Sequence, residues 1–172
     1  MQKTVRVLIM VLVIGLVFGG MAVAQTDSEI ANMELVRKAH EEVFSKGNLA
    51  VADEIYSNEI VRHSADQPVI RGRESYMQFM LGAREAFPDW KETVENIIAS
   101  GDLVAAKVMI TATMTGPLKG PEGTLPPTGK QLELPCAVFY RFAEGKIIEV
   151  WSYYDSFPIL KVIGVIPPPP PK

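Results

Sequence analysis

The sequence predicts an α+β fold in which the helices pack on one face of an antiparallel sheet. Apolar residues recur at helical spacing in the first half of the chain, and alternating, β-branched segments fill the second half. Helices that precede a run of consecutive strands commonly cover one face of the sheet that those strands form. The length of 172 residues indicates a single domain, and 48% hydrophobic residues suffice for a globular core.

Three helical patterns precede the sheet. They cover residues 27–46, 48–56 and 72–86, and Asp27 or Ser28 can cap the first of them. Gly47 and Pro88 are expected to end the first and third helices, since neither residue continues a helix well. A short extended piece, residues 60–63, separates the second and third helices.

The remaining chain predicts long strands joined by tight turns. Alternating or β-branched patterns are found over residues 90–100, 103–115, 131–142 and 146–155. The segment 116–130 between the middle strands holds four Pro and four Gly, so no regular structure is expected there. A loop of this length serves as a lid or binding loop in many proteins, and an exposed hairpin tip is the alternative.

The first 24 residues have the form of a secretory signal peptide. Lys3 and Arg6 precede an uncharged apolar run, and Ala22-Val23-Ala24 fits the small-x-small pattern of a cleavage site. We therefore expect a secreted or periplasmic protein, cleaved after Ala24. An uncleaved membrane anchor is the alternative, because the apolar run approaches the length that spans a bilayer.

Cleavage would leave one domain over residues 25–166 and a proline-rich tail over residues 167–172. The tail fits a frayed polyproline II terminus, with a ligand for a proline-binding domain as the alternative. Of the 17 basic residues, Lys3 and Arg6 would be removed, so the mature chain would carry 15 against 20 acidic ones and a net charge of −5. This balance, without a basic patch, argues against nucleic acid as a partner.

The metal-binding and nucleophilic residue types are sparse. Cys136 is the single cysteine and stands inside an apolar strand pattern, so we expect a buried, inert thiol. The two histidines, His40 and His63, stand in no cluster with metal-ligand spacing, and we expect no metal or other cofactor. His40 falls within the first helix and is interpreted as a surface or packing residue.

The last strand carries the most informative pattern. Strand side chains alternate between faces, so Glu149, Trp151, Tyr153 and Asp155 share one face. An indole, a phenol and two carboxylates on one face are typical of a pocket wall, because a core face rarely carries carboxylates and a solvated face rarely carries Trp. Glu149 and Asp155 are about 20 Å apart along an extended strand, so direct coupling between them is not expected.

Motifs in a fixed order carry a family resemblance. They are Phe87-Pro88-Asp89-Trp90, Val94-Glu95, Ser100-Gly101-Asp102, Pro127-Thr128-Gly129-Lys130, Phe139-Tyr140-Arg141-Phe142, residues 145–151 and Asp155. This order resembles the SnoaL-like polyketide cyclases of the nuclear transport factor two-like superfamily. The resemblance implies a cone-shaped barrel, with helices packed on a strongly bent antiparallel sheet around an internal pocket. It also implies a cofactor-free intramolecular aldol reaction with Asp155 as acid and base.

One position departs from the family pattern. A histidine usually follows Gly-Thr on the long middle strand of these cyclases, and Met114 stands at the matching position. His63 is then the best second acid/base or hydrogen-bond donor to substrate, with a plain surface histidine as the alternative. For Asp155 the alternative is a cap on a following helix, which would keep the carboxylate ionised and unreactive.

Two functions follow from these residues. The first is a cofactor-free cyclase or isomerase that acts on a small carbonyl-containing or polyketide-like compound through Asp155 and His63. The second is a non-catalytic protein that binds a small apolar molecule. The candidate ligand-binding residues are Trp151, Tyr153, Met114, Glu149, Trp90 and Tyr140. The outer sheet face is in addition a candidate homodimer interface.

Overall fold

The computed structural model describes residues 24–120 and 123–166, and it has the expected α+β architecture. The helical segments are α2 (Asp27–Lys38), the π-helical η1 (Ala39–Ser45), the 3-10 turn η2 (Leu49–Val51), α3 (Ala52–Ile55), α4 (Arg73–Ala86) and α5 (Phe157–Val162). The predicted signal segment, except Ala24, and the proline-rich tail lie outside the described residues. No helix in the described part of the chain is both long enough and apolar enough to span a membrane.

The N-terminus of α2 is set by Thr26 and not by Asp27 or Ser28. The Thr26 hydroxyl accepts a hydrogen bond from the Glu29 backbone N–H, and the Glu29 carboxylate accepts one from the Thr26 N–H at 2.8 Å. This reciprocal arrangement satisfies two backbone donors that have no partner inside the helix.

Six strands form one curved sheet in the order β2-β1-β8-β7-β4-β3. Their bounds are β1 (Tyr56–Ser64), β2 (Gln67–Arg71), β3 (Lys91–Ser100), β4 (Leu103–Thr113), β7 (Gln131–Ala143) and β8 (Lys146–Tyr154). The sheet is mixed rather than purely antiparallel, because β1 pairs with β8 in parallel. The short extended piece expected at residues 60–63 is thus a nine-residue strand, and β2 is an addition to the prediction.

The segment between β4 and β7 contains regular structure that its Pro and Gly content did not predict. β5 (Leu118–Gly120) and β6 (Gly123–Leu125) pair antiparallel, with Leu118 opposite Leu125. Gly123 has φ of +129°, a backbone conformation that glycine adopts without a steric penalty. Glycines therefore permit the small hairpin instead of excluding it.

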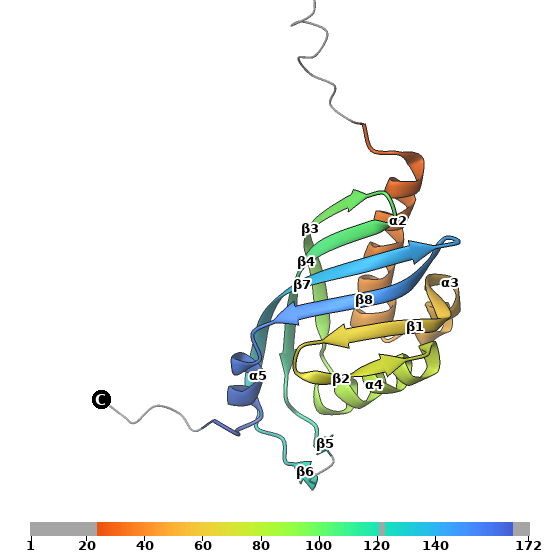
Figure 1. Cartoon of the computed structure of the whole chain (residues 1–172). Helices are drawn as coiled ribbons and strands as arrows, with labels where there is room; N and C mark the ends of the chain where they lie inside the picture. Colours follow the sequence, from red (N-terminus) through yellow and green to blue (C-terminus); the bar gives the residue numbers. More distant parts are fainter. Residues whose placement is uncertain (1–23, 121–122, 167–172) are drawn as a thin grey trace, which may run out of the picture.

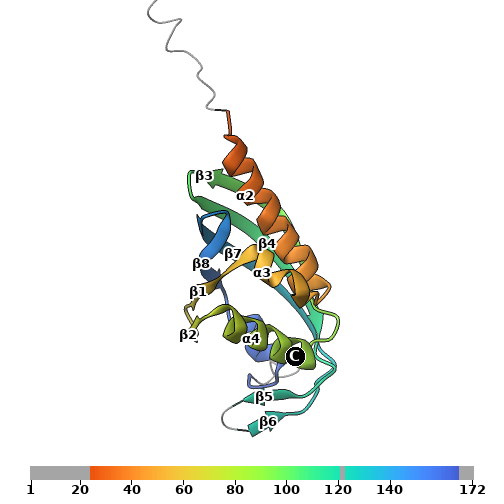
Figure 2. The same cartoon turned by 90° about the vertical axis from the view of Figure 1, so that its right-hand side faces the viewer.

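The helices lie on the concave side of the sheet (Figures 1 and 2). Shifts in the strand register help the sheet to bend, for example between Val94 and Asn96 and between Arg141 and Phe142. Figure 2 shows α2 crossing this concave side and α4 standing opposite the strands. The result is the cone that the family resemblance implies.

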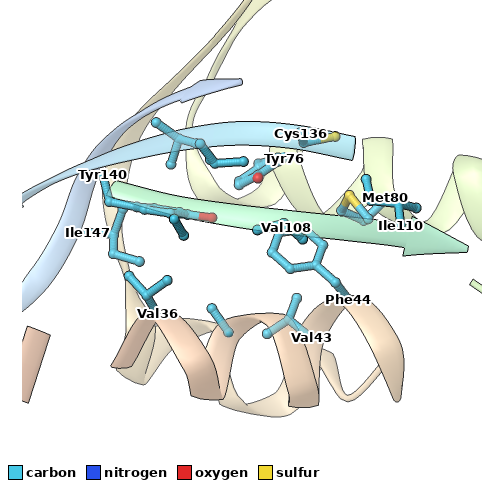
Figure 3. Packing of buried hydrophobic residues seen from close by; sticks show 14 of the residues in the cluster. Val36, Val43, Phe44, Tyr76, Met80, Val108, Ile110, Cys136, Tyr140 and Ile147 are labelled. Atoms are coloured by element: carbon cyan, nitrogen blue, oxygen red, sulfur yellow. The ribbon is translucent and has the colours of Figure 1, made fainter. Parts of the chain in front are cut away.

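The core lies between the helices and the concave face. Side chains from the first helix, including Val36, Val43 and Phe44, point toward Val108 and Tyr140 on the sheet (Figure 3). Along β7 every second residue from Leu132 to Phe142 is buried, and the residues between them are exposed or partly exposed. This alternation shows which face of β7 is internal. Residues that pair across neighbouring strands lie on the same face, so the internal face of β8 follows from its pairing with β7.

Candidate functional site

A cavity of about 730 Å³ opens inside the cone, between the concave face of the sheet and α4. Most of its wall is apolar and comes from α4, β4 and β7, for example Phe79, Met80, Leu134 and Val138. A volume of this size suits a drug-sized organic molecule. Two groups of polar side chains lie on the wall, one from η1 and β3 and the other around β1. Gln78, Glu85 and Lys119 also border the cavity.

The first polar group is a buried histidine–glutamate pair. His40 Nδ1 contacts Glu92 Oε2, and the two side chains are only 4% and 7% exposed. His40 Nε2 lies 2.6 Å from the Tyr140 hydroxyl, and Trp90 Nε1 donates to Glu92 Oε1 at 2.9 Å. All four side chains border the cavity, so an acid/base pair meets the cavity together with a phenol.

Hydrogen bonds from two side chains to the backbone hold this pair in place. The Ser45 hydroxyl donates to the His40 carbonyl at 2.8 Å and accepts from the Glu92 N–H at 2.9 Å, which ties η1 to β3. Arg84 of α4 donates to the Phe44 carbonyl at 2.7 Å, near the end of the π-helical segment. Functional sites often contain π-helical turns, and here the turn places His40 on the buried side.

Gly47 allows Arg84 to reach this position. Gly47 has φ of +69°, and a Cβ atom built on it would approach the Arg84 Nε to 2.9 Å. A larger residue would therefore be strained in its backbone and would press on the guanidinium.

The second polar group surrounds Arg62 on the inner face of β1. Arg62 is 6% exposed, donates to Gln67 Oε1 at 3.0 Å and lies 4.7 Å from the centre of the Phe79 ring. Nearby, the Tyr154 hydroxyl donates to Asp66 Oδ1 at 2.9 Å. Arg62, Gln67, Phe79 and Tyr154 all border the cavity.

Burial keeps the phenols of this region protonated. Burial raises the pKa of Tyr140 well above its ordinary value, and Glu92 and other nearby groups add to the shift. The pKa of Tyr76 is also raised, mainly by burial, although the Arg62 charge acts against the shift. These phenols are therefore hydrogen-bond donors, and not phenolates, at physiological pH.

Two of the predicted ligand-binding residues, Trp90 and Tyr140, border the cavity. The expected wall on β8 lies elsewhere. Glu149, Trp151 and Tyr153 are on the outer face of the sheet, and the inward face of β8 presents Val150, Ser152 and Tyr154. The alternation along β8 is as expected, but its internal face is the opposite one. The reason is that Val150 pairs with the buried Tyr140 on β7, which turns Glu149 and Trp151 outward.

His63 belongs to the same outer cluster. Its Nε2 lies 2.8 Å from Glu149 Oε1, and its ring stacks on Trp151 with centroids 5.6 Å apart. The Arg141 guanidinium lies 5.5 Å from the Trp151 ring centre and forms an ion pair with the Glu149 carboxylate. This outer cluster is separated from the cavity by the sheet, and its role as a homodimer interface stays a prediction.

Asp155 and Met114 also lie outside the cavity wall. Asp155 is exposed, and its Oδ1 accepts the Phe157 N–H at 2.9 Å at the start of α5. The contact resembles the cap named as the alternative, although the N-cap residue is Ser156 and Asp155 precedes it. Met114 is fully buried, and its sulfur accepts from the Thr128 hydroxyl at 3.6 Å. A catalytic role of Asp155 would require the carboxylate to leave the helix start.

Three polar residues of the cavity were missed by sequence reasoning: His40, Glu92 and Arg62. For His40 and Arg62 a signal was present in the sequence pattern. His40 is adjacent to Ala39 on the buried side of the first helix, and Arg62 follows Ile60 on the inner face of β1. An ionisable residue at a position where the helix or strand pattern expects an apolar one is rare, unless it is paired or functional. In the described residues no group of three or more metal-ligating side chains is found.

The fold and the cavity define this protein as an α+β cone with an internal cavity. A family model of the SnoaL-like polyketide cyclases matches residues 34–163, so the chain belongs to that family. No curated protein matches the chain. The family assignment and the fold thus agree with the resemblance carried by the sequence motifs.

Solved structures share the fold. A proposed SnoaL-like polyketide cyclase from Jannaschia sp. CCS1 is 24% identical, with a TM-score of 0.74 over 83% of this chain and 98% of that chain. AclR, a proposed hydroxylase from Streptomyces galilaeus, is 27% identical with a TM-score of 0.70, over 83% of this chain and 86% of that one. IdmH, a proposed polyketide cyclase from Streptomyces antibioticus, is 26% identical with a TM-score of 0.64, over 77% and 98% of the two chains.

Proposed function

We propose that this protein is a cofactor-independent cyclase or isomerase that moves a proton at the carbon next to a carbonyl group. The ligand would be a small, largely apolar carbonyl or polyketide-like compound held in the internal cavity. The observation that carries the proposal is the buried His40–Glu92 pair on the cavity wall, beside the Tyr140 phenol. Membership of the SnoaL-like family supports a reaction of this class.

Glu92 is the proposed base. Its two oxygens already accept from His40 and Trp90, but a carboxylate has about four acceptor sites, so room remains for a substrate proton. In the proposed step the C–H bond breaks, the proton moves to Glu92, and the electron pair forms the C=C bond of an enolate. Return of the proton to another carbon would complete an isomerisation.

Tyr140 is the proposed donor to the carbonyl oxygen. When His40 is doubly protonated, its Nε2–H donates to the phenol oxygen, which leaves the phenol proton free for the substrate. The enolate oxygen would then be stabilised in a dry site, where a hydrogen bond is stronger than in water. For a cyclisation, the enolate carbon would attack a second carbonyl of the same molecule, and the resulting alkoxide would take the proton from Glu92.

The second candidate function is binding without catalysis. Its supporting observation is that both ring nitrogens of His40 already have partners, Glu92 and Tyr140. Such a satisfied network can stabilise a polar site without taking part in chemistry. Native mass spectrometry of the purified protein would support this function by finding an unaltered co-purified ligand.

Hydrogen–deuterium exchange at a ketone tests the catalytic proposal without knowledge of the natural substrate. 2-Acetylnaphthalene is a flat, apolar methyl ketone, and loss of its methyl proton signal in D₂O reports enolisation. We expect the wild-type protein to accelerate exchange and Glu92→Gln to reduce that acceleration by about 100-fold or more.

Two variants outside the cavity are matched controls. Asp155→Asn and His63→Gln should exchange the ketone at the wild-type rate. Loss of exchange in Asp155→Asn would move the chemistry to the last strand and contradict the assignment of Glu92. Binding of the ketone without any acceleration over buffer would favour the second candidate function.

The location of the reaction outside the cytoplasm is a separate proposal, which rests on the signal-peptide form of residues 1–24. N-terminal sequencing of protein exported from a bacterial host should begin at Gln25. A chain that retains Met1 and sediments with membranes would support the anchor instead.

A further inference from the structure

Arg62 is a buried cation without an acidic partner. It lies on the inner face of β1 with 6% of its surface exposed, at the wall of the cavity. None of the ion pairs among the described residues includes it. A buried charge that lacks an opposite charge is costly, so its retention at a cavity wall calls for an explanation.

Its neighbours position the guanidinium but do not neutralise it. Gln67 accepts one hydrogen bond at 3.0 Å, and the Phe79 ring lies 4.7 Å from the guanidinium carbon. Both groups are uncharged. The Tyr76 phenol, also uncharged, is a further hydrogen-bond partner of Arg62. Because a guanidinium has five N–H donors in a planar fork, these contacts leave donors for a planar acceptor.

The carboxylates at or beside the cavity already have partners. Glu85 of α4, which borders the cavity, accepts from Lys119 at 2.6 Å. Glu92 is bound by His40 and Trp90, and Asp66 accepts from Ser64 and Tyr154. None of these carboxylates forms a hydrogen bond or an ion pair with Arg62. The negative charge that would match the guanidinium is therefore absent from its direct surroundings.

Arg62 and Glu92 nevertheless act on the same region of the cavity. The pKa of Cys136 is raised to about 12, mainly by burial, and Glu92 raises it further while Arg62 lowers it. Tyr76 experiences the same two opposed charges. The cavity is thus polarised, with an acid/base pair on the side of η1 and β3 and a fixed cation on the side of β1.

We infer that Arg62 binds a carboxylate of the ligand, so that the ligand is an apolar carboxylic acid which also carries a carbonyl group. The carboxylate would form a bidentate pair with the guanidinium fork. The apolar body would fill the space bordered by residues such as Phe79 and Val138, with the carbonyl toward Tyr140 and Glu92. This inference deepens the proposed function and rests on it for the location of the ligand, but not for turnover.

Binding of a matched pair of probes tests the inference. 2-Naphthoate and 2-naphthamide have nearly the same shape and differ in charge, and calorimetry measures the affinity of each for the full domain. We expect the wild-type protein to prefer the carboxylate by about tenfold or more, as for a charge-assisted pair. Equal affinities for the two probes would overturn the inference.

Three variants locate the preference. Arg62→Met keeps the length of the side chain and should bind both probes equally, while Arg62→Lys should keep only part of the preference because it lacks the fork. Arg141→Met removes an arginine from the outer face and should leave the preference unchanged. A preference for the carboxylate that survives in Arg62→Met would overturn the inference. If Arg62→Met fails to fold, Arg62→Lys and the comparison of the two probes on the wild-type protein still test it.

The outcome is separable from that of the proposed function. Glu92→Gln should retain the preference for 2-naphthoate even though it loses the exchange of 2-acetylnaphthalene. Absence of exchange in the wild-type protein, with the carboxylate preference intact, would refute catalysis and leave the carboxylate site in place.

Discussion

Two histidine–glutamate pairs lie on opposite faces of the same sheet, and each has an aromatic neighbour. The inner pair, His40 and Glu92, is 4% and 7% exposed and contacts Tyr140. The outer pair, His63 and Glu149, is 32% and 30% exposed, with the His63 ring stacked on Trp151. The residue types are the same, so the difference between the pairs lies in their contact with water.

That difference decides what each pair can do. Water and salt screen a partly exposed pair, and such pairs contribute little to stability. A buried pair beside an apolar cavity interacts more strongly and can act on a ligand that has lost its own water. The inner pair is therefore the better candidate for acid/base chemistry, although the outer pair consists of the same two residue types.

The largest contrast is expected in stability when one carboxylate of each pair is removed. Glu92→Ala leaves the His40 and Trp90 donors buried without an acceptor and should lower the free energy of unfolding by about 3–5 kcal/mol. Glu149→Ala exposes its partners to water and should cost less than about 1 kcal/mol. Urea unfolding followed by circular dichroism measures both values.

Equal losses of unfolding free energy in Glu92→Ala and Glu149→Ala would contradict this contrast, because burial would then make no difference to the contribution of each pair. A small loss for Glu92→Ala alone would show that water enters the cavity and solvates the abandoned donors.

The reactivity of thiols on the two faces gives the second contrast. Burial raises the pKa of Cys136 to about 12, whereas an exposed thiol at the neighbouring position 137 would keep a value near 9. At pH 8 the native protein should react with iodoacetamide at least about tenfold more slowly than the double variant Cys136→Ala, Ala137→Cys, because far less of its thiol is ionised. Rapid labelling of native Cys136 would contradict this expectation and would mean that the inner face of the sheet is frequently exposed to solvent.

The same thiol gives a stability effect at high pH. An unfolded chain ionises its thiol near pH 9, while the folded chain keeps the proton up to about pH 12. The unfolded state therefore binds fewer protons in this range, and stability contributed by Cys136 below pH 9 is lost as the pH rises. Cys136→Ala should reduce this alkaline loss in urea titrations made between pH 8 and 10.

The sequence was sufficient for most of the fold because its patterns are local. Alternation predicted β4 and β7 closely, and the order of helices and strands predicted the α+β class. The parallel pairing of β1 with β8 could not be predicted, since it joins segments about 90 residues apart through contacts that no local pattern records. The hairpin of β5 and β6 could not be predicted, because glycine and proline mark turns but do not say whether the flanking residues pair as strands.

The site was harder to predict because a strand pattern defines two faces without naming the inner one. The face of β8 with Trp151 has as much aromatic character as a pocket wall, yet Val150 is the residue that pairs with buried Tyr140. His40 and Glu92 are 52 residues apart, and only the packing of η1 on β3 brings them together. The contact between them therefore became visible only in three dimensions.

The smallest contrast concerns the two tyrosines. Tyr140→Phe removes a hydroxyl that lies 2.6 Å from His40 Nε2 and leaves that nitrogen buried without a partner, which should cost about 1–3 kcal/mol. Tyr153 is 53% exposed, so Tyr153→Phe should change stability by less than about 0.5 kcal/mol. Urea unfolding measures both variants, and ketone exchange by Tyr140→Phe separates the structural role of the phenol from its proposed role at the carbonyl. Loss of stability with full exchange would leave Glu92 as the base and remove Tyr140 from the mechanism.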